Sequence, residues 1–278
     1  MKKYHIKRNS VQETLLLPLY ARSKSTELYP EIFKDPKSAE LIQKIDYDFS
    51  TFEKNSQNLM QRFGYLECAM RQYDLMSEVK GYLKKYPEAS VVNIGCGLDQ
   101  TGENCDNGTC KIYNLDFSDV IEARNQMIPS QDRVKNIGVD INDIRWFEEI
   151  DKSNGVVFFA AGVFYYFPKK QFDILMSNMA EAFPMGMLVF DAANKKACRL
   201  MIKSWVQKMG ISDVDAFFYV ENVERDISTI SEKIVASYKG YMLGYHNLKL
   251  NCVSDLFRWM AWIGDNLMKI RIIRLDFR

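Results

Sequence analysis

The stretch Val91-Val-Asn-Ile-Gly-Cys-Gly-Leu-Asp99 decides the expected fold, because it leads a short apolar run straight into a Gly-x-Gly turn. Residues 91–94 have the length and composition of a buried β-strand. The glycines permit a tight turn and let the backbone approach a ligand without an intervening Cβ. Gln100 stands where a dinucleotide motif has its third glycine, and Gly102 is out of register, so the turn favours a nucleoside without a pyrophosphate.

Short β-rich runs alternate with helical stretches after residue 89. Strands are predicted at residues 91–94, 111–115, 134–139, 156–160 and 187–190, with helices between or after them at 119–127, 143–150, 169–183 and 195–210. This alternation predicts parallel pairing through right-handed crossovers. Strand-like residues 231–245 and 268–277 flank a helical stretch at 253–267, which predicts a closing antiparallel hairpin. The expected fold class is α/β, with a Rossmann-like, doubly wound, mostly parallel seven-stranded sheet.

The first part of the chain has helical rather than β periodicity. Apolar residues recur at three- and four-residue spacing in residues 10–28, 38–45 and 59–86, and Pro87 ends the last of these helices. We find no internal repeat, low-complexity tract or linker. We therefore expect one domain over residues 1–278, in which residues 1–86 form a helical cap and residues 87–278 form the α/β core.

Composition excludes several classes of protein. The 278 residues include 37 Lys+Arg and 36 Asp+Glu, so net charge gives no reason to expect a nucleic acid or an anionic membrane as partner. No stretch approaches the roughly 20 apolar residues of a membrane span. The apolar run at residues 14–21 is short, follows Gln12 and Glu13, and lacks a small-x-small cleavage site. We therefore expect no export and a cytoplasmic location.

The cysteines predict neither a disulfide framework nor a metal site. All six are spread along the chain, which indicates reduced thiols. Cys105 and Cys110 are the only close pair, and the two histidines, His5 and His246, lie far from them in sequence. A zinc site would need a second pair of ligands at similar spacing, so we expect no metal.

Acidic residues follow the next two predicted strands. Asp116 stands nineteen residues after Gly97, where a carboxylate can accept hydrogen bonds from both ribose hydroxyls, and Asp140 follows the third strand. Ligands in open α/β sheets bind at the carboxyl edge, so these groups line one crevice. A tight turn or a helix N-cap, as at Asp119 or Asp143, explains each feature taken alone. Their order and spacing together favour an adenosine that carries a neutral or cationic tail.

Several stretches resemble the successive motifs of the leucine carboxyl methyltransferase family, particularly its bacterial members related to the tetracenomycin polyketide synthesis O-methyltransferase. The matching stretches are residues 92–99, 114–124, 138–143 and 161–167, together with Tyr20-Ala-Arg-Ser23 and Phe33-Lys-Asp-Pro36. The resemblance runs from about residue 14 to the end of the chain. It implies a class I methyltransferase with S-adenosylmethionine (SAM) as its cofactor.

The resemblance also implies which residues bind SAM. Gly95 and Gly97 would face its methionine and ribose, Asp116 its ribose hydroxyls, and Asp140 with Ile141 its adenine. The SAM carboxylate would be met by an arginine of the N-terminal helices. The full set of implied cofactor residues is Arg22, Arg71, Gly95, Cys96, Gly97, Asp116, Phe117, Asp140, Ile141 and Ala161.

Two features of this set leave alternatives open. A guanidinium fork suits the SAM carboxylate, but Arg62 competes with Arg22 and Arg71, and all three could lie on a solvated helix face. Many family members have Glu-Gly-Val after the fourth strand, with the Glu near the cofactor, whereas this chain has Ala161-Gly-Val163. The departure leaves open whether position 161 contributes to the cofactor site.

Methyl transfer from a sulfonium is an in-line displacement, so the enzyme must align acceptor and methyl group and exclude water. A carboxylate acceptor needs no base, whereas a phenol or alcohol usually wants one. Tyr165, Tyr166, Asp191 and His246 are the polar candidates near the acceptor, although a core tyrosine or a satisfied histidine is the plainer explanation of each. No catalytic residue is assigned on this basis.

The sequence therefore predicts a SAM-dependent O-methyltransferase that acts on a hydroxyl or carboxylate of a small molecule. A protein C-terminal carboxyl methyltransferase is one alternative, and a non-catalytic SAM-fold binding protein is another. An NAD-linked oxidoreductase shares the fold, but Gln100 in place of the third glycine disfavours it.

Overall fold

A seven-stranded sheet forms the centre of the computed structural model, which describes residues 3–6, 13, 15–129, 131–206, 216–243 and 250–278. Its strands are β3 (Ser90–Ile94), β4 (Lys111–Asp116), β5 (Val134–Gly138), β6 (Val156–Ala160), β7 (Met187–Ala192), β8 (Ile234–Gly240) and β9 (Arg271–Phe277). They lie in the order β5-β4-β3-β6-β7-β9-β8. The first five are parallel, and β9 pairs antiparallel with both β7 and β8. The predicted fold class, including the closing antiparallel hairpin, is confirmed.

The strand order reverses between β3 and β6, which are adjacent in the sheet but separated in the chain by β4 and β5. Both strands are completely buried, because helices cover both faces of the sheet. Ile94, the last residue of β3, pairs with Leu115 on one side and Ala160 on the other. The carboxyl ends of β3, β4 and β6 therefore meet at one edge, which is where doubly wound sheets bind ligands.

Alternate side chains of each central strand enter two different hydrophobic cores. Val91 belongs to the core beneath the N-terminal helices, and Val92 belongs to the core on the opposite face of the sheet. Phe159 and Phe158 divide in the same way along β6. Strands buried on both faces carry few polar residues, which is why the sequence shows these strands as nearly continuous apolar runs.

The connecting helices lie close to their predicted positions. They are α6 (Ser118–Met127), α7 (Lys169–Ala182), α8 (Lys195–Met201) and α10 (Asp255–Asn266), whereas the short helix α9 (Val223–Asp226) was not predicted. The prediction of a helix at residues 143–150 is wrong in type, because the segment forms a short 3-10 helix, η2 (Ile144–Glu149). Asp143 caps it by accepting a hydrogen bond from the backbone N–H of Arg145. The predicted helix at 195–210 divides into α8 and a π-helical turn, η4 (Ile202–Val206), and its last residues lie outside the described ranges.

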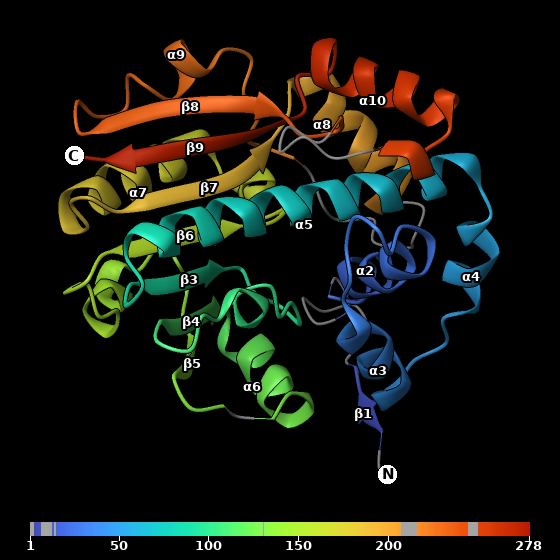
Figure 1. Ribbon diagram of the computed structural model, residues 1–278, viewed down its shortest axis with the longest axis horizontal. Helices are drawn as coiled ribbons and strands as arrows, with labels where there is room; N and C mark the ends of the chain where they lie inside the picture. Colours follow the sequence, from blue (N-terminus) through green and yellow to red (C-terminus); the bar gives the residue numbers. More distant parts are fainter. Residues whose placement is uncertain (1–2, 7–12, 14, 130, 207–215, 244–249) are drawn as a thin grey trace.

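The N-terminal part of the chain is helical, as predicted. Its helices are α2 (Leu16–Leu28), α3 (Pro36–Lys44), α4 (Ser50–Ser56) and α5 (Leu59–Lys85). Helix α4 and the two-residue strands β1 (Tyr4–His5) and β2 (Ile45–Asp46), which pair with each other, were not predicted. The predicted start of the first helix at residue 10 lies outside the described residues. Figure 1 shows α5 running across the sheet with α2 beside it, and α5 contacts β6, β7 and β9.

Three short 3-10 helices complete the described structure: η1 (Glu103–Cys105), η3 (Phe164–Tyr166) and η6 (Leu250–Cys252). Within the described ranges, no helix has the length and apolar character that crossing a membrane requires.

Two glycines give a matched test of the backbone at the turn after β3. Gly95 has φ +64°, and a Cβ there would lie 2.6 Å from Val163 Cγ2, whereas a Cβ at Gly81 in α5 would meet no atom within 4 Å. We expect Gly95→Ala to lower the free energy of unfolding by about 1–3 kcal/mol because of the left-handed backbone and the clash. Gly81→Ala should raise it by about 0.5–1 kcal/mol through helix propensity. Urea unfolding measures both, and an unchanged Gly95→Ala midpoint would contradict this structure of the turn.

Candidate functional site

The turn that follows β3 has a backbone conformation that favours glycine. Gly95 and Gly97 both have positive φ, at +64° and +48°. The Cys96 N–H donates to the Leu115 carbonyl at 3.0 Å, which ties the turn to the end of β4. Cys96 itself is buried, and burial raises the pKa of its thiol, so the side chain is a packed, protonated group. The turn therefore presents backbone rather than side chains at this edge of the sheet.

A buried arginine that the sequence analysis missed braces this turn. Arg124 on α6 is completely buried, and its Nη1 donates to the carbonyl oxygens of Gly97 at 3.0 Å and Asp99 at 2.6 Å. Its Nη2 pairs with Glu103 Oε1 at 2.5 Å. A signal was available, because Arg124 occupies the same helical spacing as the buried Val120 and so points inward.

Asp116 lies at the end of β4, beside the glycine turn. Its Oδ2 accepts the Gly97 N–H and its Oδ1 accepts the Phe117 N–H, both at 2.8 Å. Each carboxylate oxygen has a second lone pair, so both can still accept a hydroxyl donor. The Asp116 carbonyl accepts the Val139 N–H at 2.8 Å, which joins the end of β4 to the segment after β5. Three successive strand ends are thus linked by hydrogen bonds at one edge of the sheet.

The other residues expected near the adenine lie on this same edge. Phe117 is 49% exposed. Asp140 is also exposed, and one of its oxygens accepts from the backbone and side-chain N–H groups of Asn142, both at 2.9 Å. Ile141 is buried, and its carbonyl accepts the Trp146 Nε1–H at 3.0 Å. An exposed ring and an exposed carboxylate thus flank Asp116.

The two predicted arginines lie in different settings. Arg22 is 3% exposed, and it donates to Asp35 Oδ2 at 3.1 Å and to the Leu98 carbonyl at 3.0 Å. It therefore braces the residue after Gly97 from the N-terminal side. Arg71, in contrast, lines a cavity. The competing Arg62 is exposed on α5.

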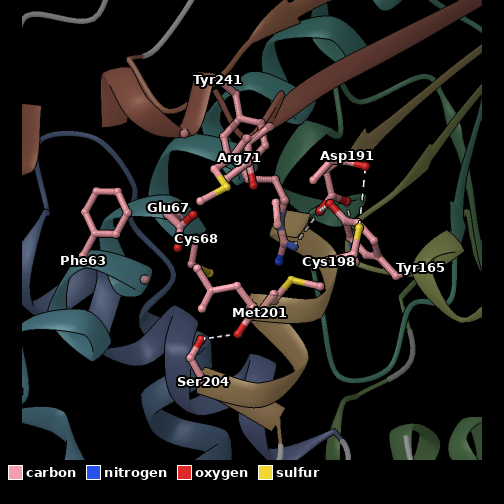
Figure 2. Close-up of a pocket in the computed structure, with 18 of the residues that line it drawn as sticks. Phe63, Glu67, Cys68, Arg71, Tyr165, Asp191, Cys198, Met201, Ser204 and Tyr241 are labelled. Atoms are coloured by element: carbon pink, nitrogen blue, oxygen red, sulfur yellow. Dashed lines mark hydrogen bonds and ion pairs between the residues drawn. The ribbon is translucent and has the colours of Figure 1, made fainter. Parts of the chain in front are cut away.

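This cavity has a volume of about 350 Å³ and lies among α5, α8, α10 and the ends of β6 and β7 (Figure 2). Its charged or hydroxyl-bearing lining residues are Glu67, Arg71, Tyr165, Tyr166, Asp191, Ser204 and Tyr241. Most of the others are apolar, among them Phe63, Met201, Met260 and Ile270. The glycine turn and Asp116 are not lining residues, so the cavity adjoins only the expected methionine end of the cofactor site, at Ala161 and Gly162.

Asp191 is the hub of the polar side of the cavity. Its Oδ1 accepts the Gly162 N–H at 2.6 Å, and its Oδ2 accepts from Arg71 Nη1 at 3.0 Å and from the Tyr165 hydroxyl at 3.1 Å. Burial, and then the Asp191 charge, raise the pKa of Tyr165 well above its usual value. Tyr165 is therefore a protonated donor that holds Asp191, which argues against Tyr165 as a base.

Arg71 keeps unused donor capacity beside the cavity. Its Nε is buried and has no hydrogen-bond partner in the described part of the chain. Burial, the largest single effect, disfavours its charge, but Asp191 and, after it, Cys68, Tyr241 and Tyr165 together raise the pKa of Arg71, so the guanidinium stays charged. An anionic group that accepted from Nε would satisfy this donor.

The remaining predicted residues are divided. Ala161 and Tyr166 both line the cavity, and Tyr166 is 42% exposed. His246 lies outside the described residues. Among the residues that the structure describes, no group of His, Cys, Asp or Glu side chains is arranged to hold a metal ion. Cys105 and Cys110 are buried free thiols.

Glu67 is the cavity residue that sequence reasoning missed. It lies on α5 four residues before Arg71, so the two side chains share one face of the helix. Burial raises the pKa of Glu67 to about 7, although the nearby Arg71 charge lowers it in part. The four-residue spacing from Arg71 was the signal available in the sequence.

Comparison with known proteins agrees with this geometry. The family model described as leucine carboxyl methyltransferase matches residues 19–180, which is more than half of the chain. The tetracenomycin polyketide synthesis O-methyltransferase TcmP of Streptomyces glaucescens is 26% identical over 188 residues, or 67% of this chain and 67% of TcmP. The S-adenosyl-L-methionine-dependent methyltransferase dpfgK of Gibberella zeae is 25% identical over 150 residues, or 50% of this chain and 49% of dpfgK.

Solved structures share the fold at low sequence identity. The plantazolicin methyltransferase BpumL, in complex with a triazolic desmethylPZN analog and SAH, superposes with a TM-score of 0.51 at 12% identity, covering 96% of this chain and 100% of BpumL. A Thermobifida fusca protein superposes with a TM-score of 0.56 at 10% identity, covering 84% of this chain and 90% of its own. By its family match, the chain belongs to the leucine carboxyl methyltransferase family of SAM-dependent methyltransferases.

Proposed function

We propose that this enzyme transfers the SAM methyl group to an oxygen atom of a small, largely apolar acceptor that binds in the cavity. The observation that carries the proposal is the position of the cavity, which is lined by Arg71, Ala161 and Gly162 but not by the glycine turn or Asp116. An acceptor there would face the methionine end of SAM. The similarity to TcmP, an O-methyltransferase of polyketide synthesis, supports oxygen as the acceptor atom.

The strand ends suit the adenosine part of SAM. Asp116 offers one further lone pair on each oxygen for the two ribose hydroxyls. Gly95, Cys96 and Gly97 would bring backbone against the ribose and methionine. Gly97 also has little room for a side chain, because a Cβ there would lie 3.0 Å from Leu15 Cδ2. The exposed Phe117 and Asp140, with Ile141, would contact the adenine. Gln100 takes the place of a third glycine, so nothing here is built for a pyrophosphate.

Arg71 is the better candidate for the SAM carboxylate. Its Nε lacks a partner among the described residues, and it borders the cavity beside Ala161. Arg22 would support the cofactor site without contacting the SAM carboxylate, because it donates its hydrogen bonds to Asp35 and the Leu98 carbonyl. With alanine at 161, the acidic side chain that contacts this loop is Asp191, which holds the Gly162 N–H and Arg71.

SAM, when bound, supplies a methyl group on a sulfonium. The protein's part is to align the acceptor oxygen with that group and to keep water out. The apolar wall contributed by Phe63 of α5 and Met260 of α10 would exclude water. Because α5 and the core strands build the cavity together, we treat residues 1–86 and 87–278 as cap and core of one domain.

The two alternative functions have less support. A protein carboxyl methyltransferase needs an open surface for a chain terminus, whereas this cavity lies among α2, α5, α8, α10 and the sheet. A non-catalytic SAM-binding protein would have no use for a cavity of this volume next to the cofactor's methionine end. An apolar small molecule fits the cavity wall best.

The cofactor site is tested by calorimetric titration of the chain with S-adenosylhomocysteine (SAH) and NAD. We expect SAH to bind and NAD not to bind. Asp116→Asn should weaken SAH binding roughly tenfold or more, because an amide replaces one charged acceptor of a ribose hydroxyl. Asp132→Asn, an exposed aspartate away from the strand ends, is the control and should leave the affinity unchanged. Binding of NAD without SAH would contradict the proposal.

The role of Arg71 has its own test, which compares SAH with adenosine. Arg71→Lys keeps the charge but loses the guanidinium fork, so SAH affinity should fall about tenfold. Adenosine lacks the carboxylate, so its affinity should not change. Arg62→Lys on the same helix provides the matched comparison and should affect neither ligand. An equal loss for adenosine, or a larger loss from Arg62→Lys, would refute the assignment of Arg71.

A further inference from the structure

The cavity wall contains three charged side chains: Glu67, Arg71 and Asp191. Two of them are already engaged with each other, since Arg71 Nη1 lies 3.0 Å from Asp191 Oδ2. Asp191 is also held by the Gly162 N–H and the Tyr165 hydroxyl. Asp191 is therefore held in place by three donors, and its negative charge balances the positive charge of Arg71.

Glu67 has no such engagement. No hydrogen bond or ion pair joins its carboxylate to another residue of the described chain. Figure 2 places Glu67 beside Cys68 on the wall of the cavity, across from Tyr165 and Cys198. The surroundings are largely apolar, with Phe63 and Met260 among the lining residues. Since the described residues supply no such donor, a molecule bound in the cavity could donate a hydrogen bond to this carboxylate.

The charge balance decides between the two kinds of acceptor. A carboxylate acceptor would face Glu67 and Asp191, with Arg71 already shared between Asp191 and the expected SAM carboxylate. Among the lining residues there is no lysine and no second arginine to hold another anion. A neutral hydroxyl, in contrast, would donate a hydrogen bond to Glu67 and satisfy it.

We propose that Glu67 is the general base of the reaction and that the acceptor group is a neutral hydroxyl, on a phenol or alcohol, rather than a carboxylate. This inference rests on the proposed function. The acceptor O–H bond breaks and its proton passes to a Glu67 carboxylate oxygen. The acceptor oxygen forms a bond to the methyl carbon, and the carbon–sulfur bond breaks with its electron pair left on sulfur, which gives neutral SAH. Glu67 then returns the proton to solvent.

The electrostatic setting of Glu67 supports this role. Burial raises its pKa to about 7, Arg71 lowers the pKa in part, and Asp191 and Asp265 raise it further. Tyr241 also lies near Glu67, whose charge contributes to raising the pKa of the Tyr241 hydroxyl. A base is most effective when its pKa lies near the working pH, because it is then both available in the ionised form and basic enough to take the proton.

The acceptor class is tested with the SAH complex at pH 8 and matched pairs of aromatic alcohols and acids of one to three rings, such as 2-naphthol and 2-naphthoate. We expect the wild type to bind the alcohol at least about tenfold more tightly than the acid. Glu67→Gln should abolish or reverse this preference, and Glu148→Gln, an exposed glutamate outside the cavity, should keep it. Preference for the acid, equal binding, or no binding of either class overturns the inference.

SAH affinity separates this inference from the proposed function. The wild type, Glu67→Gln and Glu148→Gln should bind SAH equally well. If the wild type fails to bind SAH, the proposed function itself fails. If SAH binds the wild type but Glu67→Gln loses this affinity, Glu67 belongs to the cofactor site and its assignment as base is overturned.

The titration of Glu67 gives a readout that needs no acceptor. Since its folded pKa of about 7 is raised from 4.5, the stability linked to its protonated form is complete below pH 4.5 and lost as the pH rises through 7. The glutamine variant lacks this loss. Its melting temperature relative to the wild type should therefore rise between pH 4.5 and 8, while Glu148→Gln shows no such trend. A constant difference for Glu67→Gln contradicts the assignment of Glu67 as base.

Discussion

The buried ion pair between Arg71 and Asp191 joins the long helix α5 to the carboxyl edge of the sheet. Asp191 is 3% exposed, so without Arg71 its carboxylate would be a buried, uncompensated charge. The same carboxylate fixes the Gly162 N–H and the Tyr165 hydroxyl, which sets the shape of the loop after β6. One interaction thus positions a helix, a strand end and a loop around the cavity.

A second set of buried arginines stabilises the other half of the site. Arg124 holds the Gly97 and Asp99 carbonyls from α6, and Arg22 holds the Leu98 carbonyl from α2. Carbonyl oxygens in a tight turn cannot all find partners within the turn, so these side chains compensate. The turn is therefore rigid before a ligand arrives, and Asp116 completes it by accepting the Gly97 N–H. Little conformational entropy of the turn is then lost when a ligand binds.

Much of this arrangement was predictable from sequence, and the failures have physical causes. Buried parallel strands appear in the sequence as apolar runs. The spacing of Gly97 and Asp116 indicates that the ends of two neighbouring strands lie side by side. Helical spacing suggests that Glu67 shares a face with Arg71 and that Arg124 points inward, but the cavity and the turn that these faces meet are defined by the tertiary structure. The 3-10 form of η2 was missed because the sequence pattern around the buried Trp146 and Phe147 is compatible with an α-helix as well as with a 3-10 helix.

The chain joins a nucleoside site built from strand ends to an apolar cavity built from helices, with Arg71 at their junction. A crystal structure of the chain with SAH tests this account most directly. We expect the adenosine to lie along the ends of β3, β4 and β5, the ribose hydroxyls on Asp116, and the carboxylate on Arg71. SAH bound away from Asp116, or with its carboxylate turned away from Arg71, would contradict it.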